Sequence, residues 1–107
     1  MSKLVRICPK QEIGPDQVES FQIGDKYLAV CQLDGKYYAF DELCTHQFGP
    51  LSDGWLEGYT IECPLHGARF DVRNGEAICL PAVEKLQTYK VILQGENIMI
   101  ELDGDDL

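Results

Sequence analysis

The sequence has no long apolar run. No segment approaches the roughly eighteen consecutive apolar residues that a membrane-spanning helix needs, so we expect no membrane span. The first eight residues lack the apolar stretch and small-residue cleavage site of a secretory signal, and we therefore expect a cytoplasmic protein. In that compartment cysteines more often bind metals or do chemistry than form structural disulfides. Five cysteines, an odd number, also fit a disulfide framework poorly.

Positive charge is scarce. Nine Lys and Arg residues face eighteen Asp and Glu residues, which gives a formal net charge of −9. The phosphates of nucleic acids and the surface of an anionic membrane would repel such a protein, so we expect neither as a partner. Opposite charges accelerate encounter at low salt, which favours a protein partner with a basic docking site. The simpler interpretation, that acidity only keeps a small protein in solution, remains open.

The chain also lacks the motifs of nucleotide binding and covalent catalysis. There is no P-loop, no dinucleotide fingerprint and no nucleophile elbow. Any electrons from NAD(P)H would therefore have to arrive through another protein. A length of 107 residues predicts one domain, 1–107, with no room for a second.

Helical periodicity is missing too, and the pattern is that of short strands. Turn signals recur every eight to twelve residues and separate runs rich in β-branched and aromatic side chains. Asp34-Gly35 is the sequence expected of a two-residue type I′ hairpin, and Asn74-Gly75 repeats this signal. We expect an all-β protein, a small antiparallel sandwich or a partly open barrel. The predicted strands are 3–8, 18–23, 27–33, 37–41, 60–62, 69–72, 77–80, 86–93 and 98–102.

One segment, 43–55, fits the strand pattern least. It is long, it contains Gly and Pro, and it includes Cys44 and His46. Long loops in compact domains are usually functional or disordered, and this one is too apolar for disorder. We therefore expect a packed, ordered loop. We expect Trp55, the last residue of this segment, to lie in the core, and we expect the same of Phe70 in a later predicted strand.

Two short cysteine–histidine pairs carry the chemistry. Cys44-Thr45-His46 is followed, sixteen residues later, by Cys63-Pro64-Leu65-His66, and the chain has no other histidine. Thiolate and imidazole suit both iron–sulfur clusters and zinc. Finger-type zinc sites pair Cys with Cys and His with His, whereas each pair here contributes one of each. That arrangement favours a two-iron cluster in which both cysteines reach one iron and both histidines reach the other.

Two alternatives remain beside the cluster. One is a Cys2His2 zinc site built from the same four residues. The other is a catalytic dyad of Cys44 and His46, which would leave the second pair unexplained. The remaining cysteines sit in apolar strands, so we interpret them as buried small hydrophobes and not as ligands. They are Cys8, Cys31 and Cys79.

The motif resembles that of the Rieske family. Besides the two pairs, Gly67 follows the second histidine and Phe70-Asp71 lies close behind, and the resemblance covers nearly the whole chain. It implies the Rieske fold, a small antiparallel sandwich with a cluster-binding subdomain of two loops, about 43–56 and 63–70. It also implies one [2Fe–2S] cluster, with these ligands: Cys44, His46, Cys63 and His66.

Differences from one branch of that family indicate which other branch the chain resembles. Rieske proteins of respiratory complexes carry an extra cysteine in each loop, and the two form a disulfide, whereas Gly49 and Leu65 stand at those positions here. Their serine and tyrosine hydroxyls, which donate to sulfur atoms, are replaced here by Ala68 and Phe70. Fewer donors lower the reduction potential, which we expect near the low end of the Rieske range, about −150 mV. The chain therefore resembles the Rieske ferredoxins of bacterial aromatic ring-hydroxylating dioxygenase systems.

This resemblance implies a one-electron carrier that is not itself an enzyme. It would accept electrons from an NAD(P)H-dependent flavoprotein reductase and deliver them to a terminal Rieske non-haem iron oxygenase that dihydroxylates an aromatic compound. An alternative is the small Rieske subunit of a larger redox enzyme, such as an assimilatory nitrite reductase. Permanent association with a large catalytic subunit would distinguish it. A third possibility is a cluster-bearing regulatory protein without a redox partner.

Overall fold

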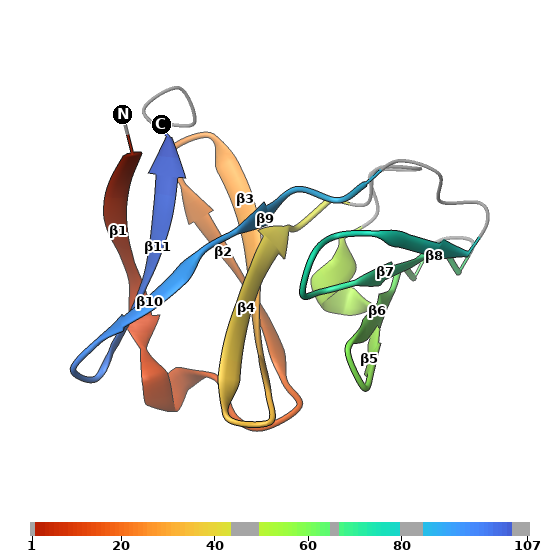
Figure 1. Cartoon of the computed structure of the whole chain (residues 1–107), viewed down its shortest axis with the longest axis horizontal. Coiled ribbons are helices and arrows are strands. Elements are labelled where there is room, and N and C mark those ends of the chain that lie inside the picture. Colours follow the sequence, from red (N-terminus) through yellow and green to blue (C-terminus); the bar gives the residue numbers. More distant parts are fainter. Residues whose placement is uncertain (1, 44–49, 65–66, 80–84, 104–107) are drawn as a thin grey trace.

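The protein is built from β-strands in three antiparallel sheets (Figure 1). The computed structural model describes residues 2–43, 50–64, 67–79 and 85–103. Within these ranges the only helical segments are two short 3-10 helices, η1 (Lys10–Glu12) and η2 (Leu51–Asp53). The all-β fold class expected from the sequence is confirmed.

Each sheet has a simple strand order. The terminal sheet, which holds the first and last strands, has the order β1 (Ser2–Pro9), β11 (Asn97–Asp103), β10 (Val91–Gln94). The middle sheet has the order β2 (Val18–Ile23), β3 (Lys26–Leu33), β4 (Lys36–Asp41), β9 (Thr88–Tyr89). The small sheet has the order β5 (Trp55–Glu57), β6 (Thr60–Glu62), β7 (Arg69–Asp71), β8 (Ala77–Cys79).

Within the middle sheet, strand β3 is buried on both of its faces. Along β3, Leu28 and Val30 belong to one hydrophobic cluster, whereas Ala29 and Cys31 belong to the other. Successive side chains of a strand point to opposite faces, so a strand covered on both sides has an unbroken apolar run. Figure 1 shows the small sheet on the far side of the middle sheet from β1 and β11. The middle sheet is therefore the platform on which the small sheet rests.

Two clusters of buried side chains result from this layering. The first lies between the middle and small sheets and contains Ala29, Cys31, Leu33, Phe40, Leu51, Ile61, Cys63, Ala68, Phe70, Val72 and Leu86. The second lies between the middle and terminal sheets and contains Cys8, Ile13, Leu28, Val30, Ala39, Tyr89, Ile98, Ile100 and Leu102. The predicted ligand Cys63 lies in the first cluster.

The two predicted hairpin turns differ in the structure. Asp34 and Gly35 both have positive φ, 53° and 76°, and Leu33 pairs with Lys36, as a type I′ turn requires. At Asn74-Gly75 only the glycine has positive φ, 83°. The Asn74 Oδ1 atom instead accepts the backbone N–H of Glu76 at 2.9 Å, and β7 and β8 are joined by a wider turn. The antiparallel pairing was predicted correctly, but the two-residue turn was not.

Most predicted strands agree with the structure to within one residue at each end. The predicted strand 86–93 is wrong, because the chain leaves the middle sheet after β9 and enters the terminal sheet at β10. The intervening Lys90 offers its carbonyl to the N–H of Glu101. Alternation of apolar and polar side chains does not show which sheet a strand joins. The sequence pattern therefore predicted one continuous strand where the chain passes from one sheet to another.

Strand β5 was missed because it lies at the end of the segment interpreted as a loop. It pairs with β6, with Trp55 opposite Glu62. The preceding residue, Gly54, approaches the Glu62 carbonyl so closely that an added Cβ would lie 1.8 Å from the oxygen. Only glycine permits this approach, which starts the pairing of β5 with β6.

Trp55 does not lie in the core, contrary to expectation, whereas Phe70 does. The Trp55 side chain is 59% exposed, and that of Phe70 is fully buried. The register explains the difference, because Trp55 and Glu62 share the outer face of the small sheet, while Phe70 and its partner Ile61 share the inner face. The prediction for Trp55 relied on side-chain size, and the position in the strand decided otherwise.

The two aromatic residues should therefore respond differently to truncation. Phe70→Ala is expected to lower the free energy of unfolding by about 3–5 kcal/mol, because it leaves a cavity in the first cluster. Trp55→Ala should change it by no more than about 0.5 kcal/mol, as is usual at exposed positions. Denaturant unfolding followed by circular dichroism measures both. Equal losses in the two variants would contradict the burial described here.

Candidate metal centre

Of the four predicted ligands, the structure describes Cys63. It follows β6 directly, and its side chain is fully buried among Leu51, Ala68 and Phe70 in the first cluster. Cys44, His46 and His66 lie outside the described residues. Within the described ranges, no group of three or more His, Cys, Asp or Glu side chains gathers as a metal site would require.

A short closed turn contains Cys63. Its backbone N–H donates to the carbonyl of Ala68 at 2.7 Å. The β6–β7 ladder ends just before it, at the pair Glu62 and Arg69. Gly67 has a φ of 69°, a conformation that residues other than glycine rarely adopt. The Cys63 backbone is therefore fixed from both ends of the turn 63–68.

The chain on either side of the first pair is also fixed. Leu43 and Pro50 form an isolated antiparallel bridge, and the Leu51 N–H donates to the Glu42 carbonyl at 2.7 Å. The six residues between, 44–49, are here called the first ligand segment because they include Cys44 and His46. The chain enters and leaves this segment at neighbouring points.

The exit of the first ligand segment and the turn 63–68 lie at the same end of the small sheet. Leu51, just after the first ligand segment, belongs to the same buried cluster as Cys63. Gly54, three residues further on, packs against the carbonyl of Glu62, which directly precedes Cys63. Segments far apart in the sequence are thus brought together where the predicted ligands require it.

The donor set and its surroundings fit a [2Fe–2S] group. In its oxidised form, the formal charges of two ferric ions, two sulfides and two thiolates cancel, so an apolar pocket can hold the group without burying net charge. Leu51, Ala68 and Phe70 supply such surroundings at Cys63. The side chains of Ala68 and Phe70, at the positions of hydroxyl donors in high-potential relatives, are buried and have no donor to offer.

The family model of the Rieske [2Fe–2S] domain matches residues 3–90. The chain belongs to the Rieske [2Fe–2S] family. Accordingly it carries one [2Fe–2S] cluster.

Several curated relatives are ferredoxins of similar length. The chain is 48% identical, over 94% of its own length and 96% of the relative's, to the ferredoxin component of a naphthalene 1,2-dioxygenase system from Pseudomonas putida. It is 37% identical, over 94% of both chains, to the ferredoxin component of biphenyl 2,3-dioxygenase from Rhodococcus jostii. Proteins with this name are electron carriers, so the chain is a ferredoxin and not a catalytic component.

Solved structures agree with the fold. The ferredoxin of carbazole 1,9a-dioxygenase from Nocardioides aromaticivorans superposes with a TM-score of 0.87 at 31% identity, covering 91% of this chain and 95% of that one. A ferredoxin from Sphingomonas yanoikuyae superposes with a TM-score of 0.88 at 31% identity, covering 94% and 100%. Among the described residues of our ferredoxin, no helix is long and apolar enough to cross a membrane.

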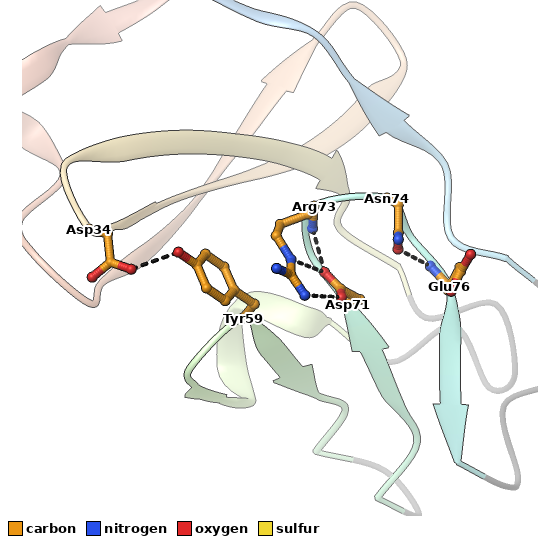
Figure 2. A network of polar contacts seen from close by, with 6 residues as sticks. All are labelled: Asp34, Tyr59, Asp71, Arg73, Asn74 and Glu76. Atoms are coloured by element: carbon orange, nitrogen blue, oxygen red, sulfur yellow. Dashed lines mark hydrogen bonds and ion pairs between the residues drawn. The ribbon is translucent and has the colours of Figure 1, made fainter.

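A polar network ties the ferredoxin's small sheet to its middle sheet (Figure 2). Tyr59, in the β5–β6 turn, donates its hydroxyl proton to Oδ2 of Asp34, at the tip of the β3–β4 hairpin, over 2.6 Å. The hydrogen bond to this carboxylate raises the pKa of Tyr59. The Arg73 guanidinium lies 4.2 Å from the centre of the Tyr59 ring. The network holds the β5–β6 turn of the small sheet against the β3–β4 hairpin of the middle sheet.

Asp71 anchors this network by pairing with Arg73. The Arg73 Nη2 atom lies 2.8 Å from Oδ2 of Asp71, and the Arg73 Nε atom lies 3.1 Å from Oδ1. Arg69, at the start of β7, pairs instead with Glu62 at 2.7 Å. The hydrogen bond from Arg73 lowers the pKa of Asp71, because it favours the ionised carboxylate.

The buried cysteines outside the motif are unreactive, as expected. Burial raises the pKa of Cys31 to about 12, although a hydrogen bond from the Tyr38 backbone acts in the opposite direction. Burial also raises the pKa of Cys8. Both side chains therefore remain neutral thiols at physiological pH, as buried small hydrophobes do. The side chain of Cys79 lies outside the described residues.

Sequence reasoning missed one residue beside the centre. Glu42, two positions before Cys44, is buried, and its carboxylate accepts hydrogen bonds from Ser52. A glutamate at the end of a strand has no sequence pattern that separates it from an exposed acid. Its partner lies ten residues away across the first ligand segment, where only the fold brings the two together.

Replacing Asp71 should remove a part of the stability that depends on pH. Because Arg73 holds the pKa of Asp71 below its usual value of 3.8, the unfolded state binds more protons, and the pair stabilises the fold fully above that value. This contribution is lost as pH falls through the lowered pKa. Asp71→Asn should therefore be less stable than the unmodified protein at neutral pH, and the difference should shrink below about pH 4.

Denaturant midpoints measured across a pH series test this expectation. The matched control is Glu57→Gln, which removes an exposed carboxylate from the same sheet. Acid lability of the cluster is common to all three proteins and cancels in the comparison. A difference between Asp71→Asn and the unmodified protein that stays constant with pH would rule out the ion pair as its cause.

Proposed function

We propose that Cys44, His46, Cys63 and His66 hold the [2Fe–2S] cluster, with both cysteines on one iron and both histidines on the other. Cys63 supports this assignment by its burial in a closed turn. The neighbouring entrance and exit of the first ligand segment support it further. We also propose that the chain forms one domain, 1–107, with cluster-binding loops about 43–56 and 63–70.

We propose further that the protein is the one-electron carrier of a bacterial aromatic-ring dioxygenase system in the cytoplasm. It would receive electrons from an NAD(P)H-dependent flavoprotein reductase and deliver them to a terminal Rieske non-haem iron oxygenase. The observation that carries this proposal is the near full-length similarity to ferredoxin components of naphthalene and biphenyl dioxygenases. In addition, a carbazole dioxygenase ferredoxin that is 28% identical, with a TM-score of 0.85, was solved in complex with its oxygenase.

The same similarity favours a separate carrier over the small subunit of a larger enzyme such as a nitrite reductase. The relatives are named as ferredoxin components, and the match spans 94% and 96% of two of them. A permanent subunit would need a large surface for a catalytic partner. We therefore place this chain among carriers that dock transiently.

When bound, the cluster supplies a centre that accepts and releases one electron. The chain's own residues set the conditions for that exchange. The buried side chains of Leu51, Ala68 and Phe70 exclude water from Cys63. Because Ala68 and Phe70 donate no hydrogen bond from their side chains, they do not stabilise added negative charge, and the potential is kept low.

Docking would combine apolar contact with charge attraction. Leu43, at the entrance of the first ligand segment, and Trp55, beyond its exit, are exposed apolar side chains. The net charge of −9 would steer the carrier toward basic sites on its partners. Trp55, exposed and not in the core, would thus act as an interface residue.

Ligand variants test the proposed site. Cys63→Ser or His66→Cys should abolish the Rieske-type EPR spectrum of the reduced protein, because each removes one of the ligands that define it. Cys31→Ser is the matched control, since Cys31 is a buried neutral thiol with no part in the site. Loss of the cluster in Cys31→Ser, with retention in Cys63→Ser, would overturn the assignment.

Ionic strength tests the proposed docking. The bimolecular rate of electron transfer from a purified flavoprotein reductase of a dioxygenase system should fall about tenfold or more from low to high salt, because salt screens the attraction between opposite charges. Stopped-flow absorbance of the cluster measures this rate. A rate that rises or stays constant with added salt would contradict the steering role of the acidic surface.

A further inference from the structure

Glu42 is the charged side chain that the fold buries most fully among the residues described. It lies directly after β4, and only 6% of it is exposed. A buried charge is costly unless hydrogen bonds compensate for lost hydration. The hydrogen bonds of Glu42 therefore indicate which part of the fold its burial stabilises.

Among the described residues, both hydrogen bonds of the Glu42 side chain come from one residue on the far side of the first ligand segment. The Ser52 backbone N–H donates to Oε1 at 2.7 Å, and the Ser52 hydroxyl donates to Oε2 at 2.6 Å. Both carboxylate oxygens act as acceptors. The structure gives Glu42 no ion pair among the described residues, so these two bonds are its compensation.

The Glu42 backbone continues the same connection. Its carbonyl accepts the Leu51 N–H at 2.7 Å, and its own N–H donates to the carbonyl of Tyr27 in β3 at 3.1 Å. Glu42 is thus held to the middle sheet on one side and to residues 51 and 52 on the other. It joins the platform, the entrance of the first ligand segment and its exit.

The carboxylate also replaces a cap that the local sequence does not provide. Ser52 lies in the 3-10 helix η2, whose N-cap residue is Pro50 and makes no side-chain hydrogen bond to the helix. The first backbone N–H groups of a helical turn have no partner within it. Glu42, directly after β4, supplies an acceptor for one of these N–H groups, that of Ser52. The start of η2, and with it the exit of the first ligand segment, is therefore fixed by a residue at the entrance.

We propose that Glu42 is a positioning residue for the cluster, because its carboxylate fastens the exit of the first ligand segment to its entrance through Ser52. This inference rests on the proposed ligand set, in which Cys44 and His46 lie between the two fixed points. Without the fastening, residues 50–52 would depend on backbone contacts such as those of Leu51 with Glu42 and of Pro50 with Leu43. The first ligand segment would then be held less firmly, and the cluster would be lost more easily.

Four variants separate this role from a general effect of charge or packing. Glu42→Ala removes both hydrogen bonds, Glu42→Gln keeps the size and one acceptor oxygen, and Ser52→Ala removes only the hydroxyl. The control Asp53→Asn neutralises an exposed acid next to Ser52 in the same helical turn. Each protein is purified with its cluster, and its iron and acid-labile sulfide are measured first.

Two readouts follow. The first is the rate at which the cluster is lost to an excess of iron chelator, monitored by visible absorbance. We expect a rate at least tenfold higher in Glu42→Ala, intermediate rates in Glu42→Gln and Ser52→Ala, and an unchanged rate in Asp53→Asn. The second is backbone hydrogen exchange, which should accelerate at residues 51–54 in Glu42→Ala and stay unchanged in β6 and β7.

Each result supports or overturns the proposal. A Glu42→Ala protein that loses its cluster at the unmodified rate would overturn it, as would an equal acceleration in Asp53→Asn. Faster exchange throughout the sheet would show a general loss of stability in place of positioning. If Glu42→Ala fails to fold, Glu42→Gln and Ser52→Ala decide by the same readouts. An unmodified protein without iron and sulfide would instead refute the proposed function.

Discussion

The site depends on one close approach between two segments that are distant in the sequence. After the first ligand segment the chain turns through η2, and Gly54 packs directly against the carbonyl of Glu62, where a side chain would collide. This contact starts strand β5 and places Leu51 in the same buried cluster as Cys63. This close approach supports the proposal that the two predicted ligand pairs share one centre.

The packing of the three sheets on one another supports that close approach. Strand β3 of the middle sheet contributes side chains to both buried clusters, so the small sheet rests on a platform that is itself packed against the terminal sheet. The Tyr59–Asp34 hydrogen bond joins the β5–β6 turn of the small sheet to the platform, and Arg73, paired with Asp71, packs on the Tyr59 ring (Figure 2). An apolar interior near Cys63 and a net charge of −9 together suit a carrier that holds a neutral centre and meets partners by charge attraction.

Much of the fold could be predicted from the sequence because short strands and turn residues leave local patterns. Asp34-Gly35 specified its turn through the backbone conformation that those residues allow. The crossing at Lys90 and the exposure of Trp55 could not be predicted, since both depend on which sheet or face a strand joins. At the site, the motif indicated the ligands, but Glu42 and Gly54 act on partners that only the folded chain brings near.

The central claim is that two cysteine–histidine pairs share one diiron centre. Because His46 and His66 are the chain's two histidines, labelling histidine with nitrogen-15 marks the proposed nitrogen ligands and nothing else. Electron–nuclear double resonance of the reduced, labelled protein measures their coupling to the unpaired electron directly. We predict two strongly coupled histidine nitrogens. A signal with one coupled histidine or none, or a protein that holds zinc and no sulfide, would contradict the account.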